Sequence, residues 1–496
     1  MDENSGHLDP TNEITLDNVK KRAVSGVAVL TGRTLILNVI SFVAQGLLWL
    51  FIEPGEFGVF LLVSATINFL SYFADIGLGA ALIQKKEKPE SSDYKTVFAV
   101  QEILVVTICL VVFAISPIIS RTHSLSHQGL MLLYALNISF FLASLKNIPS
   151  IILERKLDFV KFVVPQVLEN VIYNVTLVYF AWRGFGITSF TYAVLVRGVL
   201  GVIAMYVVQP WKPGFALSKS SLKSLLKFGI PYQINNLLAT VKDDGMTIVV
   251  GGILGSYGLG ILGTAQKLVQ YPLRFFMDNV TKVTFPAFSR MQDDKADLER
   301  SLTRSIFFIC ALVFPSIIGL IVLFPVLIEV IPKYKKWEPA YIPIILLSAN
   351  TLIAAATTQL TNLLNSTGKI KTTMKLMVMW TTLTWILVPM LSIKYGLNGA
   401  SLAYALVSAS SFVVFYIVKK ALNWSIYGSV VTPLIASLCM GLGLFLLKGL
   451  INKSSLLVFF VLIIFGSVIY ASSLYLLEGK KLIEDVKKII TPFVKK

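Results

Sequence analysis

Long apolar stretches follow one another along almost the whole chain and restrict the folds it can adopt. Fourteen stretches of about 20 residues are apolar enough to cross a lipid bilayer as helices. They span residues 24–50, 57–84, 95–117, 128–153, 162–182, 188–209, 225–254, 257–285, 305–331, 339–364, 373–393, 398–418, 427–449 and 455–477. Only 14% of the residues are charged, whereas soluble globular proteins have about 25%. The sequence therefore predicts an all-α integral membrane protein with about 14 transmembrane helices.

Segments of this apolar sequence recur about 200 residues apart. Residues 57–65 read FGVFLLVSA, and residues 257–265 read YGLGILGTA. A second pair joins Phe185-Gly186-Ile187 to Tyr395-Gly396-Leu397, and each of the four segments opens an apolar stretch. Each half holds six stretches, an even number, so both halves enter the membrane from the same side. The pattern predicts two six-helix lobes in a parallel pseudo-repeat and two extra C-terminal helices, an arrangement typical of transporters.

The apolar stretches and the segments between them predict the organisation of the chain. A proline-, serine- and lysine-containing segment lies where the first half ends and the second begins. We expect a cytoplasmic N-terminal segment at 1–23, an N-lobe at 24–209, a cytoplasmic linker at 210–224, a C-lobe at 225–420, two further helices at 427–477 and a basic cytoplasmic tail at 478–496.

Lysine and arginine are distributed unevenly among the loops. Most of the 44 basic residues lie in the N-terminal segment, the tail and the loops on the same side of the membrane. The positive-inside rule then predicts a multi-pass protein with both termini in the cytoplasm. The same distribution accounts for the net charge of +17 without nucleic acid, because the basic residues face an anionic inner leaflet.

Sequence motifs for catalysis, nucleotide binding and metal binding are absent. The segment most similar to a P-loop, residues 365–370, lacks the first glycine and the hydroxyl residue after lysine. The three histidines lie outside the apolar stretches, and the three cysteines lie in different ones. The short loops leave no room for a soluble catalytic domain. We expect no enzyme and no cofactor, and the driving force could be a gradient of H⁺ or Na⁺.

Polar and ionisable side chains recur on one face of several apolar stretches. Such residues are costly to bury in a membrane unless they face a cavity or a partner. In residues 257–285 and 225–254 they are spaced three or four apart, which places them on one face of a helix. The candidate anion contacts are Lys267, Arg274, Arg197 and Arg33. The candidate polar cavity residues are Asn38, Gln45, Asn68, Asn236, Thr240 and Tyr271.

Structural ion pairs are the alternative interpretation for some of these charges. Asp278 lies one helical turn from both Arg274 and Lys282, the spacing at which side chains on one helix can pair. For Glu169, the alternative is an ion pair with a residue of a neighbouring helix. Basic groups in a cavity favour an anionic substrate, and arginine is suited to phosphate.

Several motifs resemble those of bacterial polysaccharide exporters. They are Glu53-Pro54-Gly55-Glu56-Phe57-Gly58, residues 73–84, residues 254–260, Tyr271-Pro272-Leu273, residues 285–294, and Glu154 to Phe159 ahead of Gly184-Phe185-Gly186. The resemblance is to the Wzx-like oligosaccharide-lipid flippases of the multidrug/oligosaccharidyl-lipid/polysaccharide superfamily. It covers most of residues 24–420.

The resemblance implies a MATE-like pair of lobes in the bacterial inner membrane. Its substrate would be a polyprenyl-diphosphate-linked glycan of an O-antigen, exopolysaccharide or teichuronic-acid pathway, and polymerases or glycosyltransferases of that pathway could be partners. Asp75 and Asp244 match motif aspartates and would act in gating or ion coupling. The alternatives are a cation-coupled multidrug antiporter and, in another class, a membrane glycosyltransferase or polymerase. Charge removal at both Lys267 and Arg274 is expected to abolish export while the protein still inserts.

Overall fold

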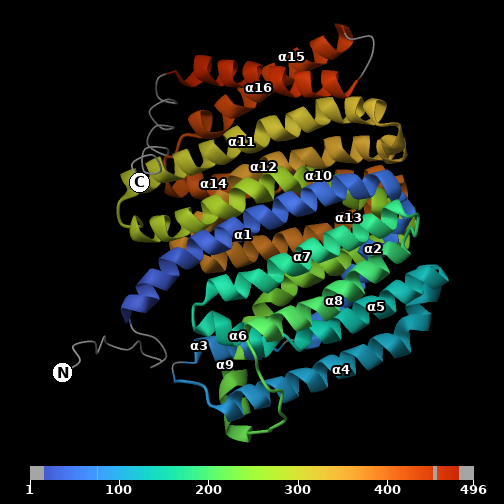
Figure 1. The fold of residues 1–496 in the computed structure, drawn as a ribbon. Coiled ribbons are helices and arrows are strands. Elements are labelled where there is room, and N and C mark those ends of the chain that lie inside the picture. The colour runs from blue at the N-terminus through green and yellow to red at the C-terminus, as the bar shows by residue number, and fades with distance from the viewer. Residues whose placement is uncertain (1–15, 75, 86, 451–454, 480–496) are drawn as a thin grey trace. The chain divides into compact units, whose positions relative to one another are not determined.

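The computed structural model describes residues 16–74, 76–85, 87–450 and 455–479, and every regular element in these ranges is helical (Figure 1). The predicted Asp75 and most of the N-terminal segment and basic tail lie outside the described residues. The α-helices are α1 (Leu16–Phe51), α2 (Pro54–Ser71), α3 (Leu78–Gln84), α4 (Ser91–Thr122), α5 (His127–Ser144), α6 (Asn147–Arg155), α7 (Phe159–Trp182), α8 (Thr188–Val208), α9 (Lys219–Thr240), α10 (Met246–Arg290), α11 (Lys295–Val330), α12 (Tyr341–Ser366), α13 (Ile370–Ala409), α14 (Phe412–Ala421), α15 (Thr432–Leu450) and α16 (Leu456–Glu478). Shorter helical turns are η1 (Tyr72–Ala74), η2 (Val241–Gly245), η3 (Pro332–Ala340) and η4 (Tyr427–Val431).

The all-helical membrane fold is confirmed, whereas the count of 14 spans is not. Within the described residues, 10 helices are long and apolar enough to cross a membrane, or up to 11 if the bent pair α5 and α6 forms one span. One reason for the difference is that α13 counts as a single helix although its backbone kinks at Gly396, between the predicted spans 373–393 and 398–418. Another is α7, whose glutamine, glutamate and asparagines lower its hydropathy.

Large apolar side chains on the outer faces of these helices fit a lipid environment. On α4, Leu110, Phe113 and Ile118 are each more than 60% exposed. A soluble protein does not present such continuous apolar surface to water. The chain is therefore a multi-pass membrane protein, as predicted.

Two glycines in the repeated segments have the same unusual backbone conformation. Gly186 has φ of 55° and Gly396 has φ of 60°. Side chains other than glycine rarely adopt this left-handed region, because Cβ then approaches the carbonyl oxygen. The recurrence of residues 185–187 at 395–397 therefore places a glycine with positive φ just before α8 and at the kink within α13.

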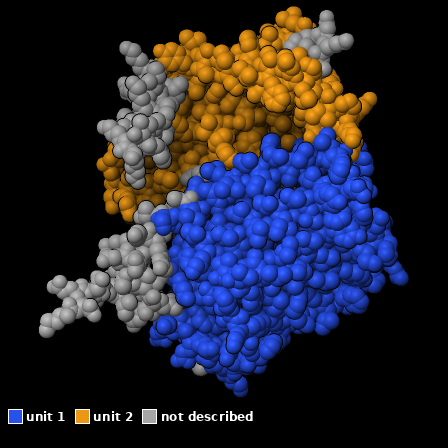
Figure 2. All heavy atoms as spheres, in the orientation of Figure 1, with its two compact units in different colours: residues 1–260 blue, residues 261–496 orange. Residues whose placement is uncertain are grey.

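The contacts of the chain divide it into two compact units, residues 1–260 and 261–496 (Figure 2). Unit 1 holds α1 to α9 and the start of α10, whereas unit 2 holds the rest of α10 and the helices after it. This division does not test the predicted lobes and their linker at 210–224, which stay a prediction.

Unit 1 is organised around α7, which packs against both α1 and α8. Helix α8 also packs against α5, and α5 packs against α2 and α4. A separate apolar cluster joins α3, α4, α6 and α9 through residues that include Leu82, Phe98 and Ile148. In unit 2, α11 packs against α12, α15 and α16, and Tyr470 donates a hydrogen bond to the Ala311 carbonyl at 2.7 Å.

Helix α2 begins at a motif that also holds the start of α8. Pro54 is the first helical residue, and Glu53 and Glu56 form a capping box in which each side chain accepts from the other residue's backbone N–H. The Glu56 carboxylate also accepts from the Ile187 N–H at 3.3 Å. A Cβ at Gly186 would lie 2.2 Å from that carboxylate, so this contact requires glycine at position 186.

The backbones of α2 and α10 touch within unit 1 at two glycines. A Cβ at Gly58 would lie 1.7 Å from the Ser256 carbonyl oxygen, and a Cβ at Gly260 would lie 1.8 Å from the Pro54 carbonyl oxygen. Gly58 lies in the repeated segment that begins at position 57, and Gly260 lies in the one that begins at position 257. The glycine of each copy therefore contacts a backbone carbonyl that lies shortly before the other copy, an approach that a side chain would block.

Candidate functional site

A row of polar side chains lies between α1, α7 and α8 in unit 1. We call it the polar seam, and its members are Ser41 on α1, Asn170, Tyr173 and Asn174 on α7, and Arg197 on α8. The Asn170 amide donates to the Ser41 hydroxyl at 3.5 Å, and the Asn174 amide donates to the Asn170 side-chain oxygen at 3.1 Å. The Arg197 guanidinium lies 5.3 Å from the centre of the Tyr173 ring, a cation–π contact.

Arg33 lies on α1, on the same flank of α7. Gly26 contacts Phe159, and Ser41 contacts Asn170, so α1 and α7 run in the same direction. Arg33 is therefore beside the first half of α7. Its Nε is buried and has no hydrogen-bond partner among the described residues, and the same holds for the Gln166 Oε1 on α7.

Arg33 and Arg197 of unit 1 lack an acidic partner in the described part of the chain. Neither Arg33 nor Arg197 forms an ion pair there. Because a charge in a low-dielectric setting needs a partner, each guanidinium is available to an anion. Arginine offers five N–H donors in a planar fork that matches phosphate oxygens. That Arg33 and Arg197 contact an anion stays a prediction.

Another buried cation of unit 1, Lys146, is already paired with an acid. The Lys146 Nζ lies 2.7 Å from the Glu169 carboxylate, and both side chains are more than four-fifths buried. The partner on a neighbouring helix expected as the alternative for Glu169 is therefore present. This pair is structural, which separates it from the two arginines without an acidic partner.

Removal of one member of this pair is expected to destabilise the protein. Lys146→Met leaves the Glu169 charge buried without a partner, which costs about 3–5 kcal/mol. The double variant Lys146→Met/Glu169→Gln is expected to recover most of that loss, because no lone charge remains. Thermal unfolding of the purified proteins measures both. Equal stability of the single and double variants would contradict the buried ion pair.

The predicted cations of α10 belong to unit 2. Lys267 and Tyr271 are half-buried, whereas Arg274 is exposed. No ion pair joins Asp278 to Arg274 or to Lys282, all three of which the structure describes. The ion pair considered from the sequence is therefore not formed in this conformation. It stays a prediction that Arg33, Arg197, Lys267 and Arg274 all bind the same substrate.

Two of the predicted polar residues meet in unit 1. The Asn68 side chain on α2 hydrogen-bonds the Asp244 carboxylate, and α2 packs against η2, which contains Asp244. Element η2 is a single turn of π-helix, a feature that is frequent at functional sites. The pairing fits the predicted gating role of Asp244 but does not test it.

The remaining predicted polar residues occupy α1 and the end of α9. Gln45 is buried and Asn38 is half-buried on α1, and Thr240 is half-buried directly before η2. The side chain of Asn236 lies outside the described residues. Among the residues that the structure describes, no group of three or more His, Cys, Asp or Glu side chains could hold a metal ion.

The α7 residues of the polar seam were not among those predicted from the sequence. Asn170, Tyr173 and Asn174 are spaced three and four apart, which puts them on one helix face. That spacing could have been recognised in the sequence. The sequence did not indicate which helices this face would meet, because α7 contacts α1 and α8 only through the tertiary fold.

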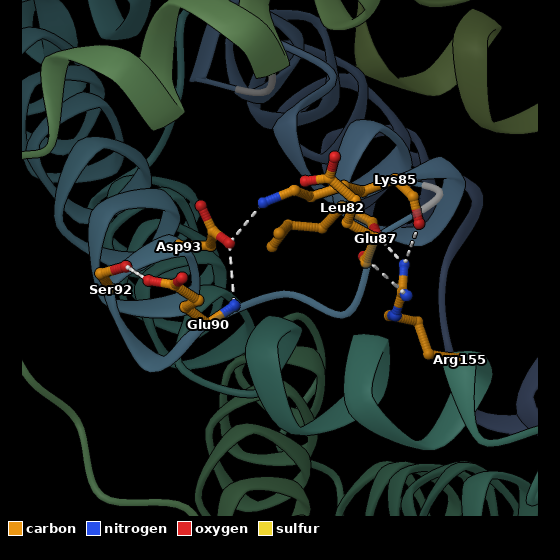
Figure 3. A network of polar contacts seen from close by, with 7 residues as sticks. All are labelled: Leu82, Lys85, Glu87, Glu90, Ser92, Asp93 and Arg155. Atoms are coloured by element: carbon orange, nitrogen blue, oxygen red, sulfur yellow. Dashed lines mark hydrogen bonds and ion pairs between the residues drawn. The ribbon is translucent and has the colours of Figure 1, made fainter. Parts of the chain in front are cut away.

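A second group of residues that was not predicted from the sequence surrounds Arg155 at the end of α6 (Figure 3). Its Nη1 donates to the backbone carbonyls of Leu82, Ile83 and Lys85, and its Nη2 donates to that of Glu87. These carbonyls end α3 and begin the loop to α4, where a helix leaves carbonyls without intrahelical partners. We call this group the Arg155 clamp.

An ion pair fastens the other side of the same loop. The Lys85 Nζ lies 2.7 Å from the Asp93 carboxylate, which also accepts from the Glu90 N–H at 2.9 Å (Figure 3). Asp93 is only 3% exposed. The loop between α3 and α4 is therefore held to both α6 and α4, and the motif residues around position 155 have a structural role.

The chain matches the sequence model of one protein family and several curated proteins. The family is described as "Polysaccharide biosynthesis protein", and the match covers residues 47–342. An "Uncharacterized membrane protein in cps region" of Klebsiella pneumoniae is 25% identical over 95% of this chain and 96% of its own length. The teichuronic acid biosynthesis protein TuaB of Bacillus subtilis (strain 168) is 23% identical over 86% of this chain and 89% of its own length. The lipopolysaccharide biosynthesis protein WzxC of Escherichia coli (strain K12) is 22% identical, over 81% of each.

Solved structures share the fold. The lipid II flippase MurJ in an inward closed conformation aligns with a TM-score of 0.72 and 17% identity, over 90% of this chain and 99% of its own. An inward-facing multidrug resistance MATE transporter of the MOP superfamily aligns with a TM-score of 0.56 and 14% identity, over 78% of this chain and 95% of its own. The resemblance predicted from the motifs and the MATE-like fold are therefore confirmed.

Proposed function

The chain belongs to the polysaccharide biosynthesis protein family, and we propose that it is a flippase that moves a lipid-linked oligosaccharide across a membrane. The substrate is a polyprenyl-diphosphate-linked glycan, carried from the inner to the outer leaflet by alternating access. Relatives named for lipopolysaccharide and teichuronic acid biosynthesis, and a MurJ-like fold, support this assignment. The protein acts as a transporter and not as an enzyme.

The observation that carries the proposal is the pair of membrane-helix arginines without acidic partners. Arg33 lies on α1 and Arg197 lies on α8, and both of these helices pack against α7. A diphosphate offers oxygens to which each guanidinium can donate. The amides and hydroxyls of the polar seam supply the hydrogen bonds that sugar hydroxyl groups need. In our proposal, Lys267 and Arg274 bind the same anionic group at another stage of the cycle.

We place the protein in the bacterial cytoplasmic membrane with both termini in the cytoplasm. The basic residues of the loops support this orientation. Asp244, which is held by Asn68, acts as a gating residue in our proposal, because a carboxylate in a π-helical turn changes its partner when that turn repacks.

The test combines gene deletion with charge removal in the organism that carries the gene. Deletion is expected to remove the surface glycan and to accumulate its lipid-linked precursor in the inner leaflet. Arg33→Gln/Arg197→Gln is expected to lower surface glycan by about tenfold or more, because each charged hydrogen bond contributes about 1.5–3 kcal/mol. The amount of surface glycan and of membrane-inserted protein is measured for each strain.

A matched control removes the same charge from an exposed position. Arg300 on α11 has a side chain that is 66% exposed, and Arg300→Gln is expected to leave export unchanged. Lys267→Ala/Arg274→Ala is the corresponding variant for α10 and is expected to abolish export while the protein still inserts. Normal glycan display in the deletion strain would overturn the proposed function.

A cation-coupled multidrug antiporter is the second candidate, because the MATE transporter shares the fold. A cavity for organic cations should be lined by acidic and aromatic groups, whereas the polar seam contains an arginine without an acidic partner. Drug susceptibility in a host without its own efflux pumps distinguishes the two. Resistance conferred by this chain would favour the antiporter.

A further inference from the structure

One buried carboxyl group of unit 1 has no role in the proposed substrate site. Glu102 lies in the first half of α4, directly after Gln101 and ahead of a long apolar sequence, and is only 5% exposed. Its side chain meets Ser144, the last residue of α5. Ionisable residues inside membrane helices are costly and usually functional, so Glu102 needs an explanation.

The hydrogen atoms around Glu102 can be counted. The Ser144 Oγ lies 3.0 Å from the Glu102 Oε2 and 2.7 Å from the Phe141 carbonyl oxygen. A serine hydroxyl has one hydrogen, and the carbonyl can only accept. The Ser144 hydroxyl therefore either shares its one hydrogen between the two oxygens or receives a second hydrogen from a protonated Glu102. In the protonated state each contact has a hydrogen of its own, because the Glu102 carboxyl donates to the Ser144 Oγ and Ser144 donates to the Phe141 carbonyl.

The rest of the surroundings also disfavour an ionised Glu102. Its Oε1 has no hydrogen-bond partner among the described residues. The nearby end of α5 carries the partial negative charge of a helix C-terminus, which repels a carboxylate. The Tyr206 hydroxyl on α8 donates to the Leu145 carbonyl at 3.1 Å. A negative charge on Glu102 would therefore rest on the Ser144 hydroxyl, which also contacts the Phe141 carbonyl.

The charged groups of the helices packed against α4 have other partners or face outward. Lys85, after α3, is paired with Asp93 of α4, and Glu56 on α2 accepts backbone N–H groups. Lys146, after α5, is paired with Glu169. The lysines of α9 at positions 219, 223 and 227 are exposed, and the one histidine of α5 is in its first turn. The described residues thus place no cation against Glu102.

We propose that Glu102 is protonated in this conformation and is a proton-binding site that takes up and releases one proton in each transport cycle. When the end of α5 moves away from α4, water reaches the carboxyl, which transfers its proton to that water and becomes a solvated carboxylate. Protonation from the other side of the membrane restores the present state. The coupling of this proton to export rests on the proposed flippase function, whereas the proton site itself does not.

Infrared spectroscopy of the purified full chain tests the proton site directly. A protonated carboxyl has a carbonyl-stretch band that a carboxylate lacks. Wild-type protein at neutral pH is expected to show a buried-carboxyl band that is absent from Glu102→Gln. Glu87→Gln, which changes an exposed residue of the loop before α4, is the control and is expected to retain it. Identical bands in wild type and Glu102→Gln would overturn the proton site.

Export in cells tests the coupling. Glu102→Gln has the shape and the hydrogen-bond donor of the protonated acid, so its melting temperature is expected to match that of the wild type. Wild-type export is expected to fall when an ionophore dissipates the pH gradient, whereas Glu102→Gln is expected to export at one reduced rate with or without the gradient. Glu102→Asp, which keeps a carboxyl, is expected to respond to the gradient.

The two proposals fail in distinguishable ways. If the deletion strain displays normal glycan while the infrared band depends on Glu102, the flippase function fails and the proton site stands. If export requires the gene but Glu102→Gln responds to the gradient as the wild type does, the coupling is overturned. Dependence of export on a sodium gradient in place of the pH gradient would overturn it as well.

Discussion

Replacement of Gly58 by alanine is expected to prevent unit 1 from packing correctly. The new Cβ would lie 1.7 Å from the Ser256 carbonyl oxygen and 2.8 Å from the Gly260 nitrogen. Both are backbone atoms, so no side-chain rotation relieves the overlap and one helix must shift. Overpacking of this kind costs about 3 kcal/mol or more. The expected result is a large loss of monodisperse protein in size-exclusion chromatography after detergent extraction.

Gly32 supplies the matched control for this prediction. It lies in the interior of α1, and a Cβ there would meet nothing within 4 Å. Because alanine favours helices over glycine by about 0.5–1 kcal/mol, Gly32→Ala is expected to be neutral or slightly stabilising. Gly260→Ala is expected to resemble Gly58→Ala, since its Cβ would overlap the Pro54 carbonyl oxygen. Wild-type yield and melting temperature for Gly58→Ala would show that α2 and α10 do not cross at this point.

Replacement of Arg155 by alanine is the second change with a large expected effect. The Arg155 side chain is 8% exposed and donates to four backbone carbonyls at the end of α3 and in the following loop. Without the guanidinium, these acceptors lose their partner, and an unsatisfied buried polar group costs about 1–3 kcal/mol. A total loss of about 3 kcal/mol or more is expected in the free energy of unfolding, measured by thermal or denaturant unfolding of the purified protein.

Two further variants separate the geometry of the clamp from its charge. Arg155→Lys keeps the charge but cannot reach carbonyls on both sides of the loop, so it is expected to recover only part of the lost stability. Lys88→Ala removes a cation from an exposed position in the same loop and is expected to change stability by less than about 0.5 kcal/mol. Full stability of the lysine variant would mean that charge alone holds the loop.

The fold class was predictable because a membrane restricts the backbone to few solutions. Hydrocarbon offers no hydrogen bonds, so a long apolar stretch must satisfy its own backbone as a helix. The number of spans was less predictable. Two predicted spans count as one helix in α13 although the backbone kinks between them at Gly396. The polar residues of α7 make it less apolar than the helices around it.

The candidate site was predictable only as a set of helix faces. Spacing along α1 places Asn38, Ser41 and Gln45 on one face, but spacing does not identify the helix that this face meets. The structure places α7 there, which adds Asn170 and Tyr173 to the seam. It also separates Lys146, which is paired, from Arg197, which has no acidic partner among the described residues.

The sequence by itself determined that this chain is a helical membrane protein with a repeated frame, and its motifs indicated the family. These properties follow from apolar length, helical spacing and the recurrence of short segments, all of which are local along the chain. Only the tertiary structure decided that Gly58 and Gly260 touch, that Arg155 holds the end of α3, and that Glu102 shares one serine hydroxyl with a backbone carbonyl. Each of these depends on atoms from segments distant in sequence, whose distances are set by packing and not by spacing.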